Sequence, residues 1–134
     1  TMRIPTRVFA TDIHAAFKLA KQQFAARSLP SIPKYFVLVS DGDPHAHARG
    51  FGYQADLSLA DSLKNGNPTL NLDPVHVFTL YSGETRTFNN DYSEWVRKAS
   101  ITHMRKLASN MESFYFFDDY PQLVNLFEQI SSCL

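Results

Sequence analysis

One apolar run limits what this chain can fold into, because it stops abruptly at acidic residues and a glycine. The run and its end read Tyr35-Phe36-Val37-Leu38-Val39-Ser40-Asp41-Gly42-Asp43. A short unbroken apolar stretch, with prolines before it and a turn after it, predicts a strand buried on both faces of a sheet. Ligands of open α/β sheets bind beyond the carboxyl ends of the strands. Asp41 is the first polar side chain that we expect at such a site.

Apolar runs and amphipathic segments alternate along the rest of the chain. Apolar residues at helical spacing predict helices over residues 12–27 and 54–64, in two pieces from residue 92, and after residue 119. Runs of β-branched and aromatic residues predict two more strands, at residues 75–81 and 113–117. The order is helix, strand, helix, strand, helix, strand, helix. It predicts an α/β fold, a Rossmann-like, doubly wound, mostly parallel sheet with helices on both faces.

Length and composition narrow the class of protein. The 134 residues suffice for a single domain, and 13 basic against 13 acidic residues give a net charge of zero. Since there is no basic stripe, we expect no nucleic-acid partner. No apolar run approaches the length that spans a membrane, so we expect no membrane span. The single cysteine, Cys133, cannot form an internal disulfide, which favours an intracellular setting.

Several short motifs together resemble the von Willebrand factor A (vWA) domains. The strand that ends in Ser40-Asp41-Gly42 resembles that family's strand ending in Thr-Asp-Gly, and Ala10-Thr11-Asp12-Ile13 resembles its Gly-Gly-Thr-Asx helix start. Three later segments resemble the family's closing helix, its Tyr-Phe strand and its final helix: Met104-Arg105-Lys106-Leu107-Ala108, Phe114-Tyr115-Phe116-Phe117, and Phe127 with Ile130. The resemblance covers residues 10–130 in order and spacing.

The resemblance implies a metal-ion-dependent adhesion site that holds Mg²⁺ or another divalent cation above the sheet. Thr11 matches the family's second-loop threonine, and Asp41 matches its third-loop aspartate, which commonly acts through water. Mg²⁺ takes six oxygen ligands and keeps several waters, so a hydroxyl and a carboxylate suit it. An open coordination position would accept a carboxylate of a protein partner. The implied function is protein-protein interaction, as an adhesion or scaffold module with no catalysis of its own.

The family's first metal loop, Asp-x-Ser-x-Ser after the first central strand, has no counterpart here. Only ten residues precede Thr11, and Asp56-Leu57-Ser58-Leu59-Ala60, which has part of the spelling, is interpreted as helix surface. The chain therefore resembles the C-terminal portion of a vWA domain, with one edge of the strand at Tyr35 unpaired unless residues 3–10 cover it. We expect a protein partner that supplies the missing loop and central strand. Without it, the chain is expected to be unstable or oligomeric.

Two other functions stay open. The loop Asp41-Gly42-Asp43-Pro44-His45-Ala46-His47 places two carboxylates and two imidazoles within seven residues. Such ligands suit zinc, manganese or iron, so one alternative is a small metal-dependent hydrolase. The other alternative is a vWA-like scaffold subunit whose cation site has been lost. The plainer interpretation makes Asp41 a turn former and Thr11 a helix N-cap. The remaining histidines, including His14 and His103 on predicted helices, offer little to a hydrolytic centre.

Overall fold

The computed structural model describes residues 13–27, 32–40, 51–70, 72–82 and 91–132, and helices alternate with strands throughout them. The helices are α1 (Ile13–Arg27), α2 (Phe51–Asn65), α3 (Asp91–Leu107) and α4 (Tyr120–Ser132), the strands are β1 (Lys34–Ser40), β2 (Val75–Ser82) and β3 (Phe114–Phe117), and two 3-10 turns are η2 (Pro68–Leu70) and η3 (Met111–Ser113). The predicted order is confirmed, with α3 as one continuous helix in place of two pieces.

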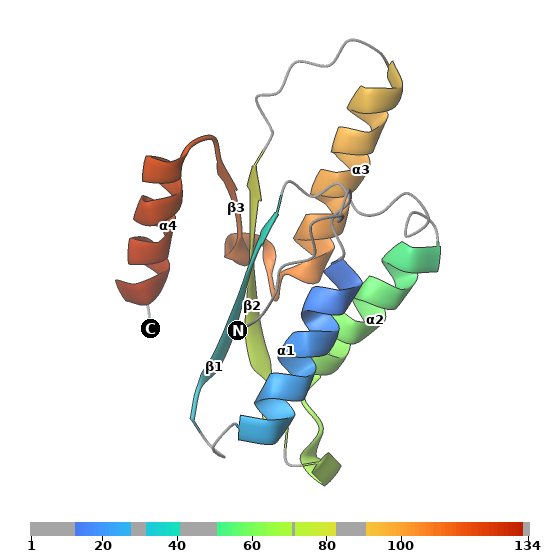
Figure 1. Cartoon of the computed structure of the whole chain (residues 1–134), viewed down its shortest axis with the longest axis vertical. Helices are drawn as coiled ribbons and strands as arrows, with labels where there is room; N and C mark the ends of the chain where they lie inside the picture. Colours follow the sequence, from blue (N-terminus) through green and yellow to red (C-terminus); the bar gives the residue numbers. More distant parts are fainter. Residues whose placement is uncertain (1–12, 28–31, 41–50, 71, 83–90, 133–134) are drawn as a thin grey trace, which may run out of the picture.

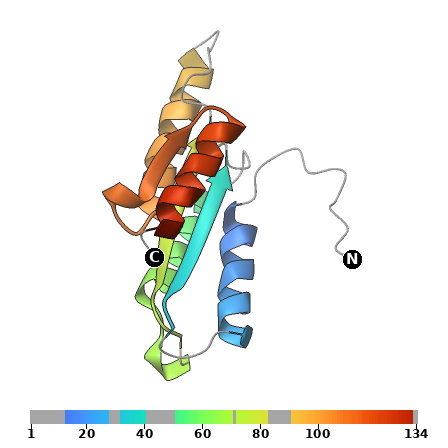
Figure 2. The ribbon, with the colours of Figure 1, turned by 90° about the vertical axis from the view of Figure 1, so that its left-hand side faces the viewer.

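The strands form a parallel sheet in the order β1-β2-β3. β1 pairs with β2 along its whole length, from Lys34 beside Val75 to Ser40 beside Tyr81. Helices α1, α2 and α3 lie on one face of this sheet and α4 lies on the other (Figures 1 and 2). The Rossmann-like, mostly parallel α/β fold with helices on both faces is therefore confirmed.

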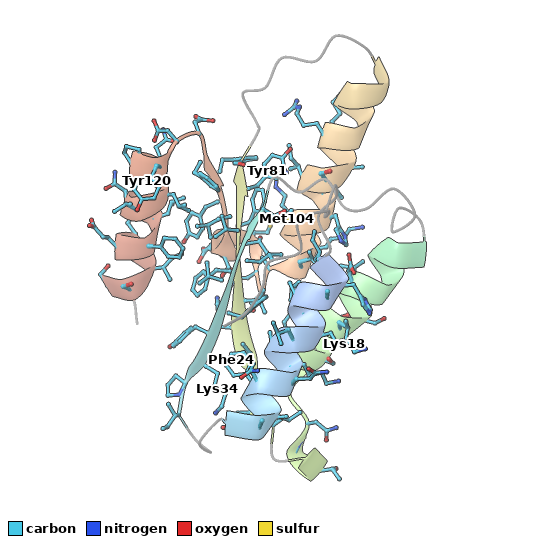
Figure 3. All side chains as sticks on the ribbon, viewed as in Figure 1. Lys18, Phe24, Lys34, Tyr81, Met104 and Tyr120 are labelled. Atoms are coloured by element: carbon cyan, nitrogen blue, oxygen red, sulfur yellow. The ribbon has the colours of Figure 1, made fainter. Side chains whose placement is uncertain are left out.

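A hydrophobic core fills each side of the sheet. The larger one lies under α1, α2 and α3 and includes Tyr81 and Met104, which are labelled in Figure 3. The smaller one lies under α4, around Phe78, Leu80 and Ile130. Successive residues of β2 point to opposite faces, so this strand contributes to both cores. Among the described helices, none is both long and apolar enough to cross a membrane.

The central strand is β2, and the prediction that the strand at Tyr35 is buried on both faces is wrong. β2 is buried from Val77 to Tyr81 without interruption. In β1, Tyr35 is 38% exposed and Val39 is 41% exposed, while Leu38 on the opposite face is buried. The physical reason is position, because β1 is the last strand on its side of the described sheet and the core under α4 reaches it at Val37. An unbroken apolar run does not tell a central strand from an edge strand.

Local signals fix two of the helix ends. Asp119 Oδ1 accepts a hydrogen bond from the Gln122 amide at 2.9 Å, and Gln122 Oε1 accepts one from the Asp118 amide at 2.6 Å. This reciprocal arrangement caps the start of α4. α2 ends at Asn65, as the Asn-Gly pair predicts, and Gly66 follows with a φ of 69°. That left-handed conformation suits a glycine just after a helix.

Candidate functional site

In sequence, the predicted cation ligands adjoin the end of β1 and the start of α1. β1 ends at Ser40 and α1 begins at Ile13, and each of these ends is the upper end of its element (Figures 1 and 2). Thr11, Asp41 and the loop residues 43–47 lie outside the described residues. The cation ligands and the hydrolase loop therefore stay predictions.

A buried carboxylate joins the helices on the larger face. Asp56 on α2 is 1% exposed, and its Oδ2 accepts a hydrogen bond at 3.0 Å from Nε2 of the buried His103 on α3. Its Oδ1 lies 3.5 Å from Nδ1 of the half-exposed His14 on α1. Oδ1 has no hydrogen-bond partner within the part of the chain that the structure describes. Asp56, His14 and His103 form what we call the Asp56 junction, where three helices meet at one carboxylate.

The interpretation of residues 56–60 as helix surface is wrong at Asp56 and at Ala60. Asp56, Ala60 and Leu63 are all buried, and they follow one another at helical spacing along α2. Ala60 and Leu63 belong to the buried stripe of α2, and Asp56 lies on the same side of the helix, two turns before Leu63. This helical spacing was the signal in the sequence that Asp56 is buried. A buried aspartate needs a polar partner, and the buried face of α3 supplies one in His103.

The Asp56 junction is not arranged as a metal centre. No group of three or more histidine, cysteine, aspartate or glutamate side chains could hold a metal ion in the described ranges. Ser100, one turn before His103 on α3, is also buried, and its Oγ has no hydrogen-bond partner within those ranges. The junction is therefore a polar contact between helices, closed to ligands on the His103 side.

A cavity of about 540 Å³ opens at the other end of the sheet, where β1 and β2 begin. Lys34 and Tyr35 of β1 and His76 of β2 line it, with Lys64 and Asn65 from the end of α2. Lys34, labelled in Figure 3, lies at the lower end of β1, opposite to the end where this strand finishes. The volume lies in the usual range of small-ligand sites, roughly 300–1,000 Å³.

The two lysines of this cavity differ in their partners. Lys34 Nζ donates hydrogen bonds to Asp73 Oδ2 at 2.8 Å and to the Ile32 carbonyl at 2.9 Å. Lys64 Nζ donates to the Lys106 carbonyl at 2.8 Å, and its nearest described carboxylate is Asp61 at 3.8 Å. Burial lowers the pKa of Lys64, and the Asp61 carboxylate partly opposes that change.

A serine-histidine pair beside this cavity has a structural role. His76 Nε2 lies 2.7 Å from Ser113 Oγ, and the Ser113 hydroxyl donates to Asn110 Oδ1 at 2.9 Å. Since the serine proton goes to Asn110, His76 Nε2 is the donor in the first bond. A nucleophilic serine needs the opposite direction, with its proton passed to the histidine. Ser113 is also buried. The pair therefore holds η3 against β2.

Comparisons with known proteins give no relative against which to set this geometry. A scan against protein-family models finds no match, and neither do searches of curated proteins and of solved structures. The class of protein is the one that the fold defines, a Rossmann-like parallel α/β protein.

Proposed function

We propose that this chain is a vWA-like interaction module that binds another protein along β1 and through a divalent cation at the carboxyl end of that strand. The exposed edge of β1 is the observation that carries the proposal. Tyr35 and Val39 project from one face of a seven-residue strand and are 38% and 41% exposed. Within the described residues, no strand pairs with the edge of β1 that faces away from β2.

Such an edge is suited to binding an added strand. Main-chain groups along an open strand edge pair with an extended segment of a partner, and neighbouring apolar side chains add contact area. In the vWA resemblance, the missing first central strand would lie at this edge. The order β1-β2-β3 supports the proposal, since it leaves that position open at one side of the described sheet.

The proposed cation is Mg²⁺, with Thr11 and Asp41 among its ligands. Asp41 follows the last residue of β1 directly, and Thr11 stands two residues before the start of α1. Parallel strands and the helices that follow them bring such loops to one end of a sheet, where α/β proteins bind ligands. A hydroxyl and a carboxylate leave coordination positions for waters and for a carboxylate of the partner.

The cation half of the proposal is tested with Mn²⁺, which also favours oxygen ligands and broadens nearby NMR signals. We expect Mn²⁺ to broaden the amide signals of Ile13 and Ser40, and Mg²⁺ to compete. Asp41→Ala should abolish the broadening, whereas the matched control Asp43→Ala should keep it.

Each other outcome counts against this site. Broadening that survives Asp41→Ala places the ion elsewhere, and no broadening at all favours the scaffold with a lost cation site. Tight Zn²⁺ binding that disappears in the double variant His45→Ala, His47→Ala would favour the hydrolase.

The edge half of the proposal is tested with Val39→Lys, which puts a charge on the exposed apolar face of β1. An edge lysine opposes strand addition. We expect the parent chain to self-associate in the absence of its partner, and Val39→Lys to shift it to monomer in light scattering after size exclusion. Leu19→Lys on α1, where Leu19 is 50% exposed, is the control and should change nothing. A parent chain that is already a stable, cooperatively unfolding monomer would overturn this half.

A further inference from the structure

The cavity at the start of β1 and β2 stands apart from the proposed cation site, and it shares Tyr35 with the proposed partner edge. It lies where these strands begin, whereas the proposed cation site lies where β1 ends. Its lining combines two lysines with the rings of Tyr35 and His76, whose centroids are 6.4 Å apart. A fully apolar cavity would select ligands by their shape alone, whereas lysine side chains and aromatic rings line this one.

Of the two lysines, Lys64 has the amine with the weaker ion pair, since its distance to Asp61 is 3.8 Å and that of Lys34 to Asp73 is 2.8 Å. The Lys34 amine is held by two hydrogen bonds, to Asp73 Oδ2 at 2.8 Å and to the Ile32 carbonyl at 2.9 Å, which hinder its attack on a ligand. The Lys64 side chain is only 17% exposed, and the distance from Nζ to Asp61 is 3.8 Å. Its hydrogen bond to the Lys106 carbonyl uses one N–H, so a neutral amine can keep this bond and still present its lone pair.

We propose that this cavity binds a small aldehyde with a planar aromatic group, and that the ε-amine of Lys64 captures it as an imine. The Lys64 nitrogen attacks the carbonyl carbon, and a C–N bond forms as the carbonyl oxygen takes up a proton. The resulting carbinolamine loses that oxygen as water, which takes both hydrogens of the amine with it. No oxidant or reductant is needed for the step. Tyr35 and His76 both line the cavity, and their rings are the proposed contacts of the planar group.

Burial of Lys64 supports this reactivity, because it lowers the pKa of the amine and so increases the neutral fraction near neutral pH. Desolvated lysines are the ones that proteins use for imine formation. Asp61 acts in the opposite direction, since its carboxylate raises the pKa of Lys64. The structure thus provides a variant that should increase the reaction rate.

The test uses 4-formylbenzoate as the probe, with cyanoborohydride to reduce any imine to a stable amine, and mass spectrometry of peptides to locate the adduct. We expect labelling of Lys64 to saturate with probe concentration and to be several-fold faster than labelling of Lys34 or of Lys18 on α1. Lys64→Met should remove the saturable component. Lys34→Met should leave it in place.

Asp61→Asn is the decisive variant, because it removes a negative charge on the surface of α2 and leaves the residues that line the cavity unchanged. It should raise the rate of Lys64 labelling several-fold at pH 7. An unchanged or lower rate in Asp61→Asn overturns the proposal, even if Lys64→Met fails to fold. Labelling of Lys64, Lys34 and Lys18 at similar, non-saturating rates also overturns it, because the probe would then be an adventitious reagent only.

Discussion

Replacement of Asp56 by alanine tests the correction that the structure makes to the sequence interpretation. The variant removes a carboxylate that is 1% exposed and leaves His103 Nε2 without its acceptor at 3.0 Å. The loss of a hydrogen bond to a buried polar group costs about 1–3 kcal/mol. We expect Asp56→Ala to lower the free energy of unfolding by about 1–3 kcal/mol.

The assay is urea unfolding followed by circular dichroism, with Asp61→Ala as the matched control on the same helix. The Asp61 side chain is 65% exposed and lies 3.8 Å from Lys64 Nζ. Because the carboxylate is exposed and this distance is long for an ion pair, we expect the pair to contribute about 0–1 kcal/mol. The two aspartates are five residues apart on α2 and have the same helix propensity, so the difference between their variants reports burial and the histidine contacts.

A double-mutant cycle with His103→Ala isolates the contact itself. If Asp56 and His103 stabilise each other, the loss in the double variant will be smaller than the sum of the two single losses, by at least about 0.5 kcal/mol. Additive losses would show that the hydrogen bond contributes nothing. Equal effects of Asp56→Ala and Asp61→Ala would show that the Asp56 carboxylate contributes no more than an exposed one.

Three further predictions follow from single contacts. Gly66→Ala should lower stability in urea unfolding by more than about 1 kcal/mol, since Gly66 has a φ of 69° and an added Cβ would lie 2.5 Å from the Leu72 carbonyl oxygen. Thr79→Val should cost about 0.5–1.5 kcal/mol in the same assay, because it removes the hydroxyl that donates to the Met104 carbonyl at 2.8 Å; Thr69→Val, at an exposed position, is the control. Burial lowers the pKa of Lys64 in the folded chain. At pH values between that lowered pKa and the ordinary lysine pKa of about 10.4, the unfolded chain therefore binds more protons than the folded chain. Stability relative to Lys64→Met should therefore rise with pH through this window, and a flat or falling difference would contradict it.

The elements could be predicted because their signals are local. The cap of α4 at Asp119 and the glycine after α2 depend on residues within one turn of the chain. The parallel order followed from the alternation of helices and strands, since a crossover helix between strands leaves few arrangements open. The fold class therefore needed no tertiary information.

The histidine partner of Asp56 and the exposure of Tyr35 could not be predicted in the same way. Both depend on contacts between residues far apart in sequence. Asp56 meets a histidine 47 positions later in the chain, and β1 is half exposed because β2 takes the central place. Tyr35 lies in a run as apolar as the one in β2, so composition predicts the same burial for both strands. Tertiary contacts make β2 the buried central strand and β1 the partly exposed edge strand.

The edge position of β1 also links the two halves of the proposed function. If a partner adds a strand parallel to β1, that strand ends beside Asp41, because parallel strands finish at the same end of a sheet. Its next loop then lies where further cation ligands are needed. An antiparallel strand would bring its beginning there instead, and the following loop would lie near Lys34 at the opposite end of β1. The proposed module therefore requires a parallel partner strand. In the variant Val39→Cys, a disulfide with a cysteine near the end of the partner strand would form only in the parallel arrangement. A disulfide with a cysteine near the beginning of that strand would show an antiparallel arrangement. The partner would then bind the edge of β1 without supplying cation ligands from the loop that follows its strand.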